Sequence, residues 1–318
     1  MEKELISIIV PCYNEQEVLP LFREEILRVT DSMAEKYPYL EFEFMFINDG
    51  SRDATLDILR DYSLEDSRFR YISFSRNFGK EAGMLAGLEH SKGDYVVILD
   101  ADLQHPPEFI PQMYEYILCG AYDCATTKRT SRKGEPKLLS FFSKGFYRVI
   151  NKISQTRIEE STSDFRFMTR QMVDAILSMQ EYNRFSKGIF SWVGFRTKYI
   201  EYENVERAAG KTTWNFWKLL KYALDGIIAF STAPLAFPII ISALLLITSL
   251  ILLICAVNGS SAFLGILCVI FFIGGLQLLG TGIIGQYLSK TYTEVKNRPK
   301  YIIGETEETY KNRKDNLL

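Results

Sequence analysis

Short apolar runs alternate with longer stretches of helical periodicity through the first third of the chain. The apolar runs lie at residues 5–10, 41–47, 69–74 and 95–99, and each predicts a β-strand. Strands that alternate with helices at this spacing are typical of βαβ units, so the sequence predicts an α/β fold with a parallel sheet. Pro11 lacks a backbone N–H and is expected to end the first strand.

Polar side chains gather where these predicted strands end. The carboxyl ends of parallel strands meet at one edge of a sheet, and ligands of open α/β sheets bind just beyond that edge. Four polar segments at one edge therefore predict a nucleotide-binding cleft. The segments are Tyr13-Asn14-Glu15, Asp49-Gly50-Ser51, residues 76–80 and residues 100–102.

Two acids, Asp100 and Asp102, directly follow the run at residues 95–99. An apolar run rich in β-branched residues suits a strand that is covered on both faces. Carboxylate oxygens at its end suit Mg²⁺ or Mn²⁺ held together with the phosphates of a substrate. The alternative is structural: Asp100 opens a turn, and Asp102 caps the helix that follows Pro106 and Pro107.

Composition and motif content narrow the function classes. The chain has 318 residues and a formal net charge of −2, which gives no sign of a nucleic-acid partner. The sequence contains no P-loop motif and no Gly-x-Gly-x-x-Gly after the first predicted strand, which argues against a P-loop NTPase and a dehydrogenase. The five cysteines show no metal-binding spacing, and two histidines are too few for a zinc site.

A long apolar segment distinguishes the C-terminal part of the chain. Residues 226–289 contain no Asp, Glu, Lys, Arg or His, and a helix needs about 20 apolar residues to cross a bilayer. We therefore expect two transmembrane helices, at residues 234–257 and 262–288, joined by a short turn at residues 258–261. Basic residues flank both ends of this hairpin, and the positive-inside rule places the two flanks in the cytoplasm.

Four motifs carry a resemblance to a known family. VPCYNE, INDGSRD, SRNFGKEAG and LDADLQHPPE resemble, in order and spacing, the inverting glycosyltransferases of family 2. The chain is most similar to their polyprenyl-phosphate branch, which includes dolichol-phosphate mannose synthase and bacterial undecaprenyl-phosphate glucosyltransferases. The match covers almost the whole chain, because the bacterial subgroup also has a C-terminal apolar hairpin. The resemblance implies a Rossmann-like GT-A domain with a parallel-rich sheet.

The resemblance also implies which residues bind the sugar nucleotide. Asp49 is expected to contact the base or ribose. Asp100 and Asp102 are expected to hold the metal and the diphosphate, with Lys80 adding positive charge. A divalent cation there neutralises the charge that develops on the leaving diphosphate. The remaining nucleotide-sugar residues are Pro11, Tyr13, Glu15 and Gln104.

On the acceptor side, the resemblance gives Asp164 the position of the catalytic base, and Asp102 is the second residue expected to be catalytic. A lipid monophosphate does not need a base at neutral pH, because its second pKa is ~6 by analogy with phosphoserine. Asp164 is therefore expected to orient the acceptor or the sugar more than it takes a proton. The segment at residues 206–214 matches the family's Arg-x-x-Gly-x-Ser pattern with Thr in place of Ser. Its Arg207, Lys211 and Thr212 would bind the acceptor phosphate.

These observations predict three parts of the chain. Residues 1–225 form a cytoplasmic GT-A domain that includes amphipathic interface helices near residues 137–150 and 214–225. Residues 226–289 form the transmembrane hairpin, and residues 290–318 form a cytoplasmic tail that is expected to be loosely ordered from Lys300 onward. The protein is thus expected in the cell membrane as a multi-pass protein with both termini in the cytoplasm.

The expected reaction is inverting transfer of a single hexose, with UDP-glucose favoured as donor, to polyprenyl (undecaprenyl) phosphate. No Gln-x-x-Arg-Trp motif is present, and Tyr182-Asn183-Arg184-Phe185 lies where processive synthases of the family carry it. The alternatives are a processive polysaccharide synthase and a membrane scaffold that keeps an inactive GT-A fold. Resemblance to the bacterial members implies a homo-oligomer, a tetramer.

Overall fold

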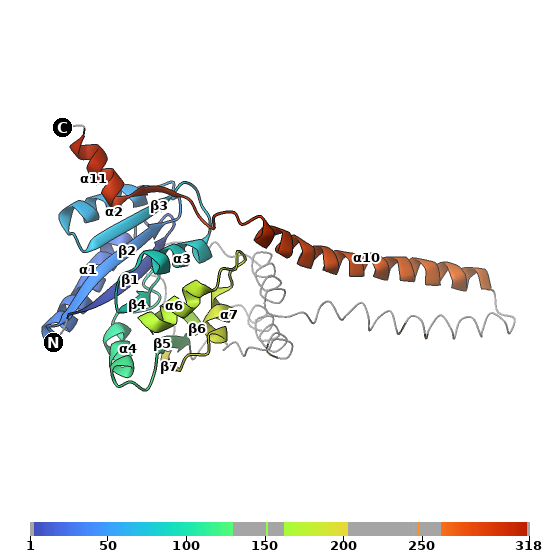
Figure 1. Ribbon diagram of the computed structural model, residues 1–318, viewed down its shortest axis with the longest axis horizontal. Helices are drawn as coiled ribbons and strands as arrows, with labels where there is room; N and C mark the ends of the chain where they lie inside the picture. The colour runs from blue at the N-terminus through green and yellow to red at the C-terminus, as the bar shows by residue number, and fades with distance from the viewer. Residues whose placement is uncertain are drawn as a thin grey trace.

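A computed structural model describes residues 3–129, 151, 162–202, 244, 247 and 262–316. Its centre is an eight-stranded sheet in the order β7-β5-β6-β4-β1-β2-β3-β8 (Figure 1). The strands are β1 (Glu4–Cys12), β2 (Leu40–Asn48), β3 (Phe69–Phe74), β4 (Tyr95–Ile98), β5 (Cys124–Arg129), β6 (Thr162–Thr169), β7 (Thr197–Tyr202) and β8 (Ile303–Thr306). The helices are α1 (Leu19–Lys36), α2 (Thr55–Glu65), α3 (Lys80–His90), α4 (Phe109–Leu118), α6 (Arg170–Ser178), α7 (Ser186–Trp192), α10 (Ala262–Val295) and α11 (Glu307–Asp315).

The predicted parallel sheet is confirmed in its central part. β1 pairs in parallel with β2 and with β4, and β2 pairs in parallel with β3. β6, β5, β7 and β8 extend this core on both sides with mixed strand directions. The fold is therefore a Rossmann-like α/β fold whose sheet is mostly parallel.

The prediction that Pro11 ends the first strand is wrong, because β1 continues to Cys12. Pro11 pairs with Ile47 of β2, while the pairing of β1 with β4 ends at Ile9. The carbonyl of Ile9 accepts from the Leu99 N–H on the β4 side. Pro11 faces that same side two residues later, beyond the end of β4, so its missing N–H removes no ladder bond.

Helices cover both faces of the sheet and divide the core in two. Alternate side chains of β1 point to opposite faces: Ile8 belongs to the core cluster that includes side chains of α1, α2 and α4, whereas Ile9 belongs to the cluster that includes side chains of α3, α6 and α7. The helix α3 lies very close to β1, because a Cβ on Gly87 would come within 2.1 Å of Ile9 Cγ2. This close packing fixes the N-terminus of α3 beside the carboxyl ends of the strands.

The tail after α10 is ordered, which contradicts the prediction of a loose tail from Lys300 onward. β8 pairs antiparallel with β3 and forms one edge of the sheet, and α11 follows it directly. In Figure 1 the C-terminus and α11 lie beside α2 and β3, next to the N-terminal half of the domain. The predicted tail is thus a structural part of the sheet.

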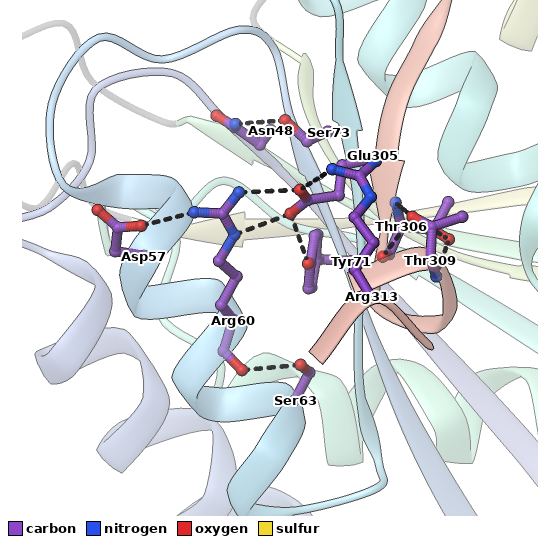
Figure 2. Close-up of polar contacts among 10 residues, drawn as sticks. All are labelled: Asn48, Asp57, Arg60, Ser63, Tyr71, Ser73, Glu305, Thr306, Thr309 and Arg313. Carbon is purple, nitrogen blue, oxygen red and sulfur yellow. Dashed lines mark hydrogen bonds and ion pairs between the residues drawn. The ribbon is translucent and has the colours of Figure 1, made fainter. Parts of the chain in front are cut away.

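Ion pairs explain why this polar segment is ordered (Figure 2). Glu305 accepts from Arg60 through Nε at 2.8 Å and Nη2 at 2.9 Å, and from the Tyr71 hydroxyl at 2.8 Å. Glu307 accepts from Arg70 Nε at 2.9 Å. Both acids are buried against partners more than 230 residues earlier in the chain.

The helix α10 extends away from the domain (Figure 1). Many of its large apolar side chains are exposed, among them Phe263, Ile270, Leu278 and Leu288. Within the described residues, no helix meets the length and apolarity that a membrane span requires. The predicted first span and both predicted interface helices lie outside the described residues except for single positions, and the hairpin stays a prediction.

Candidate functional site

The loops that follow β1 and β2 bind each other at the edge of the sheet. Asn14 has a left-handed backbone with φ of 57°. Its N–H donates to Ser51 Oγ at 2.9 Å, and its side-chain oxygen accepts from the Arg52 N–H at 2.9 Å. Asn48 at the end of β2 donates to Ser73 at the end of β3, also at 2.9 Å (Figure 2). The predicted polar edge is therefore a connected structure.

Asp49 holds the next loop in place. Its two carboxylate oxygens accept from the backbone N–H groups of Phe78, at 2.6 Å, and Gly79, at 2.8 Å. Burial raises the pKa of Asp49, while these two hydrogen bonds oppose that shift. Gly50 has φ of 65°, and a Cβ there would lie 2.5 Å from the carbonyl carbon of Arg76. Asp49 and Gly50 together position residues 76–79 immediately before α3.

The centre of the site is an ammonium group between two carboxylates. Lys80 is the first residue of α3, and its Nζ lies 2.7 Å from Asp100 Oδ1 and 2.8 Å from Asp164 Oδ2. Asp100 follows β4 and Asp164 lies on β6, the antiparallel neighbour of β4. Residues expected to serve the donor side and the acceptor side thus meet at one lysine.

The charges of this cluster support one another. Although burial favours the neutral acid, Lys80 and Lys187 hold the pKa of Asp164 well below its usual range. Burial likewise opposes the charge on Lys80, yet Asp100 and Asp164 raise the pKa of Lys80 well above its ordinary value. Lys80 and Asp164 are therefore both ionised at neutral pH.

The end of β1 faces several acids of the same site. Burial raises the pKa of the Cys12 thiol, and the negative charges of Glu15, Asp100 and Asp53 raise it further. Pro11 lies within β1 just before Cys12, and Tyr13 just after it is 39% exposed. The structure thus brings Pro11, Tyr13, Glu15 and Asp100 to one edge, as the sequence predicted.

Asp102 does not cap the helix that follows, so the structural alternative for this residue is wrong. Its Oδ1 accepts from the Gln104 N–H at 3.1 Å, and α4 begins only at Phe109 with Glu108 in the capping position. His105 is buried, and its Nδ1 lies 2.6 Å from the Tyr202 hydroxyl. The turn that carries Asp102 is held next to β7.

Few residues are available to bind a metal ion. The part of the chain that the structure describes contains no cluster of three or more His, Cys, Asp or Glu side chains able to hold one. Asp100 and Asp102 offer hard oxygen ligands of the kind that Mg²⁺ and Mn²⁺ prefer. Two such ligands fit an ion that takes its other oxygens from phosphates and water. The predicted acceptor residues Arg207, Lys211 and Thr212 lie outside the described residues.

Sequence reasoning missed the layer behind Asp164. Glu81, next to Lys80, accepts from the Ser186 N–H at 3.2 Å and from the Ser186 hydroxyl. Arg166, two residues after Asp164, is buried with its guanidinium 3.9 Å from the Phe190 ring centroid. The charge of Arg166 lowers the pKa of Asp164, and the charge of Asp164 raises the pKa of Glu81. The sequence indicated one part of this arrangement: residues two apart on a strand face the same side, which places Arg166 on the same face of β6 as Asp164.

Comparison with known proteins assigns the family. The sequence profile described as Glycosyl transferase family 2 matches residues 7–177, which include every cluster residue named above up to Asp164. This chain is a member of glycosyl transferase family 2. It is 41% identical over 312 residues to the putative glycosyltransferase CsbB of Bacillus subtilis, covering 96% of this chain and 93% of that protein. It is 43% identical over 309 residues to the SfII prophage-derived bactoprenol glucosyl transferase of Shigella flexneri, covering 94% and 97%.

Among solved structures, this family 2 chain is similar to glucosyl-3-phosphoglycerate synthase from Mycobacterium tuberculosis in complex with Mn²⁺, UDP-glucose and phosphoglyceric acid. The identity is 16% and the TM-score 0.44, and the match covers 71% of this chain and 78% of that one. The family assignment makes the protein a glycosyltransferase. It confirms the resemblance predicted from the four sequence motifs.

Proposed function

We propose that the enzyme transfers one glucose, with inversion, from UDP-glucose to a polyprenyl phosphate. The observation that carries the proposal is the Lys80 ammonium between Asp100 and Asp164, because it joins the predicted donor and acceptor sides at one point. Relatives at about 40% identity over most of their length are named bactoprenol glucosyl transferases, which supports glucose and a polyprenyl acceptor.

In this proposal the acceptor phosphate oxygen attacks the anomeric carbon opposite the departing diphosphate. A new carbon–oxygen bond forms to the acceptor phosphate as the bond to the diphosphate breaks, and the nucleoside diphosphate leaves with the bonding electron pair. Lys80 provides positive charge at the place where the leaving group becomes more negative. Asp49 contributes by fixing the loop from which Lys80 starts.

Asp164 is proposed to orient the reactants rather than to remove a proton. A carboxylate whose pKa is held low by Lys80 and Lys187 is a weak base at neutral pH. The attacking phosphate is itself already an anion near neutral pH, since a phosphate monoester has a second pKa of about 6. The negative charge of Asp164 instead keeps Lys80 in place between the two sides of the site.

A divalent ion, Mg²⁺ or Mn²⁺, is proposed to bind Asp100 and Asp102 together with the donor diphosphate. When bound, it neutralises charge on the departing phosphates. Asp100 contacts Lys80 through both carboxylate oxygens, so ion and lysine would share this carboxylate. The chemistry of the donor set supports the assignment, because both ligands are hard oxygens.

We further propose that the enzyme works at the cytoplasmic face of the cell membrane as a homo-oligomer. The exposed apolar side chains of α10 support contact with lipid or with neighbouring apolar helices, and the acceptor itself is a lipid. Fractionation tests the location: the protein should stay in the membrane pellet after washing with high salt and alkali. Release by salt alone would contradict it. Cross-linking before solubilisation would test the oligomer.

The proposed reaction is tested with purified full-length protein in detergent. Labelled UDP-glucose, UDP-N-acetylglucosamine, UDP-galactose and GDP-mannose are each offered with undecaprenyl phosphate, with Mg²⁺, with Mn²⁺ or with EDTA. We expect one glucosyl lipid from UDP-glucose and loss of product in EDTA. Asp164→Asn should lower turnover. A polymeric product, or full activity of Asp164→Asn from pH 6 to 8, would refute the mechanism.

A further inference from the structure

A polar cavity lined by Gly79 and Glu81, the two neighbours of Lys80 in the chain, lies beside the catalytic cluster. Its volume is about 390 Å³, within the range of small-molecule sites. Three segments that are distant in the sequence form its walls: the loop at residues 76–79 with the start of α3, the loop at residues 182–184, and Lys300 between α10 and β8. The lining does not include the cluster of Lys80, Asp100 and Asp164.

The side chains that line the cavity carry an excess of positive charge, while Glu89, Glu181 and Glu294 act on Arg184 and Lys300 from outside the lining. Arg76, Arg184 and Lys300 line it, against the single carboxylate of Glu81. Arg76 donates to the Asn77 carbonyl and Arg184 to the carbonyls of Met179 and Ile176. Among the described residues none of the three cations forms an ion pair with a carboxylate. Glu81 does not neutralise them by contact, because its oxygens accept from Ser186 of α7.

A buried donor without a hydrogen-bond partner indicates, as the cations do, a ligand with acceptor atoms. The Asn183 side-chain Nδ2 is buried and has no hydrogen-bond partner among the described residues. Its Oδ1, in contrast, accepts from Lys290 Nζ at 3.3 Å, which fixes the orientation of the amide. A buried donor without a partner costs free energy, and buried polar groups normally find one. The free N–H₂ group and the cations are all donors, so the matching ligand is an acceptor that carries negative charge.

We propose that this cavity binds a phosphate-bearing anion. A phosphate offers several acceptor oxygens and more than one negative charge, which matches one amide donor and cations from three segments. The cavity is larger than a single inorganic ion needs, so an organic phosphate fits best: the phosphate of an anionic phospholipid headgroup or of a soluble phosphate ester. The assignment is independent of the proposed glucosyl transfer, because it rests on other residues.

Because of where the cavity lies, a bound anion would connect segments that are distant in the sequence. Glu294 near the end of α10 accepts from the Tyr182 N–H at 2.8 Å, so the loop at residues 182–184 is attached to that helix. Lys300 belongs to the linker between α10 and β8. An anion held by Arg76, Arg184 and Lys300 therefore joins the base of α10 to the loop that precedes the catalytic Lys80. Binding should raise the thermal stability of the whole chain.

The test uses the full chain with EDTA present, so that metal-dependent binding at Asp100 and Asp102 does not contribute. One arm titrates inorganic pyrophosphate into the protein in detergent, and the other compares the protein in nanodiscs of phosphatidylglycerol with the protein in nanodiscs of phosphatidylcholine. The readouts are the melting temperature and, for pyrophosphate, the dissociation constant. Stabilisation by pyrophosphate indicates a soluble phosphate ester as the ligand, and stabilisation by phosphatidylglycerol alone indicates a lipid headgroup.

Two variants and one control decide whether the cavity is responsible. Lys300→Gln should weaken binding at least about tenfold, the usual effect of losing one charged hydrogen bond. Asn183→Asp keeps the acceptor for Lys290 but replaces the unsatisfied donor with a negative oxygen, and it should abolish stabilisation. Lys296→Gln removes an equal charge from the exposed end of the same linker and should behave as the parent. If neither probe stabilises the parent chain, or if all three variants respond alike, the proposal is overturned.

Discussion

The ionisation of Glu81 should make the stability of the enzyme depend on pH between about 4.5 and 7. Burial raises the pKa of Glu81 to about 7, and repulsion from Asp164 adds to this, while the bonds from Ser186 and the charge of Arg184 oppose it. The folded chain therefore binds one proton more than the unfolded chain between these pH values. The free energy of unfolding must fall as pH rises through this window, and the full penalty is present above pH 7.

The size of this penalty follows from the two pKa values. Moving the pKa of one carboxyl from 4.5 to about 7 corresponds to about 3 kcal/mol when the group is charged. The variant Glu81→Gln removes the charge but keeps one oxygen that can accept from Ser186. Losing the second acceptor removes about 1 kcal/mol. We expect Glu81→Gln to be about 2 kcal/mol more stable than the parent at pH 8 and no more stable than it at pH 5.

The assay is urea unfolding of parent and variant in detergent at pH 5, 6, 7 and 8, followed by tryptophan fluorescence. The difference between the two proteins at each pH removes contributions from all other groups. Glu24→Gln on the exposed face of α1 is the matched control and should give a difference that does not change with pH. If the Glu81→Gln difference is equally constant from pH 5 to 8, Glu81 is not held at a raised pKa and the reasoning is refuted.

Three further changes test other parts of the structure. Lys80→Gln leaves Asp100 and Asp164 facing each other without a cation, so turnover should fall about 100-fold or more. Lys80→Arg keeps the positive charge and should keep part of the turnover. Equal activity of the two variants would argue against a bridging role for the charge. Glu305→Gln breaks the ion pair with Arg60 and should lower unfolding stability by about 2 kcal/mol, while Glu308→Gln on exposed α11 should change it little. Gly50→Ala forces a left-handed residue against the Arg76 backbone and should cost at least about 1 kcal/mol, measured by the melting temperature.

The sequence predicted the half of the fold that is built from local patterns. The apolar run at residues 69–74 is β3 with the same bounds, and the polar segments after the central strands do meet at one edge. These predictions succeeded because periodicity and the direction of parallel strands are properties of neighbouring residues. The continuation of β1 through Pro11 was missed, since it depends on where the neighbouring strand β4 ends.

The rest depends on contacts between residues that are far apart in the chain. Lys80 was recognised as a donor-site residue, but its contact with Asp164 becomes visible only when α3 and β6 are placed in space. The same holds for Glu81 with Ser186, and for Glu305 with Arg60. A charged residue has the same local pattern whether it is solvated or paired, so the sequence alone favours the solvated interpretation.

The strand β8 has a consequence for biosynthesis. β7 and β8 lie at opposite edges of the sheet, and β8 comes after α10 in the chain. Domains commonly fold while the ribosome is still translating. Here the Arg60 and Tyr71 side chains must wait for Glu305, which is made more than 230 residues after them. The nascent enzyme therefore carries an open strand edge at β3 until β8 has been made. Truncations that remove β8 should be retained by chaperones or degraded even though Lys80, Asp100 and Asp164 are present.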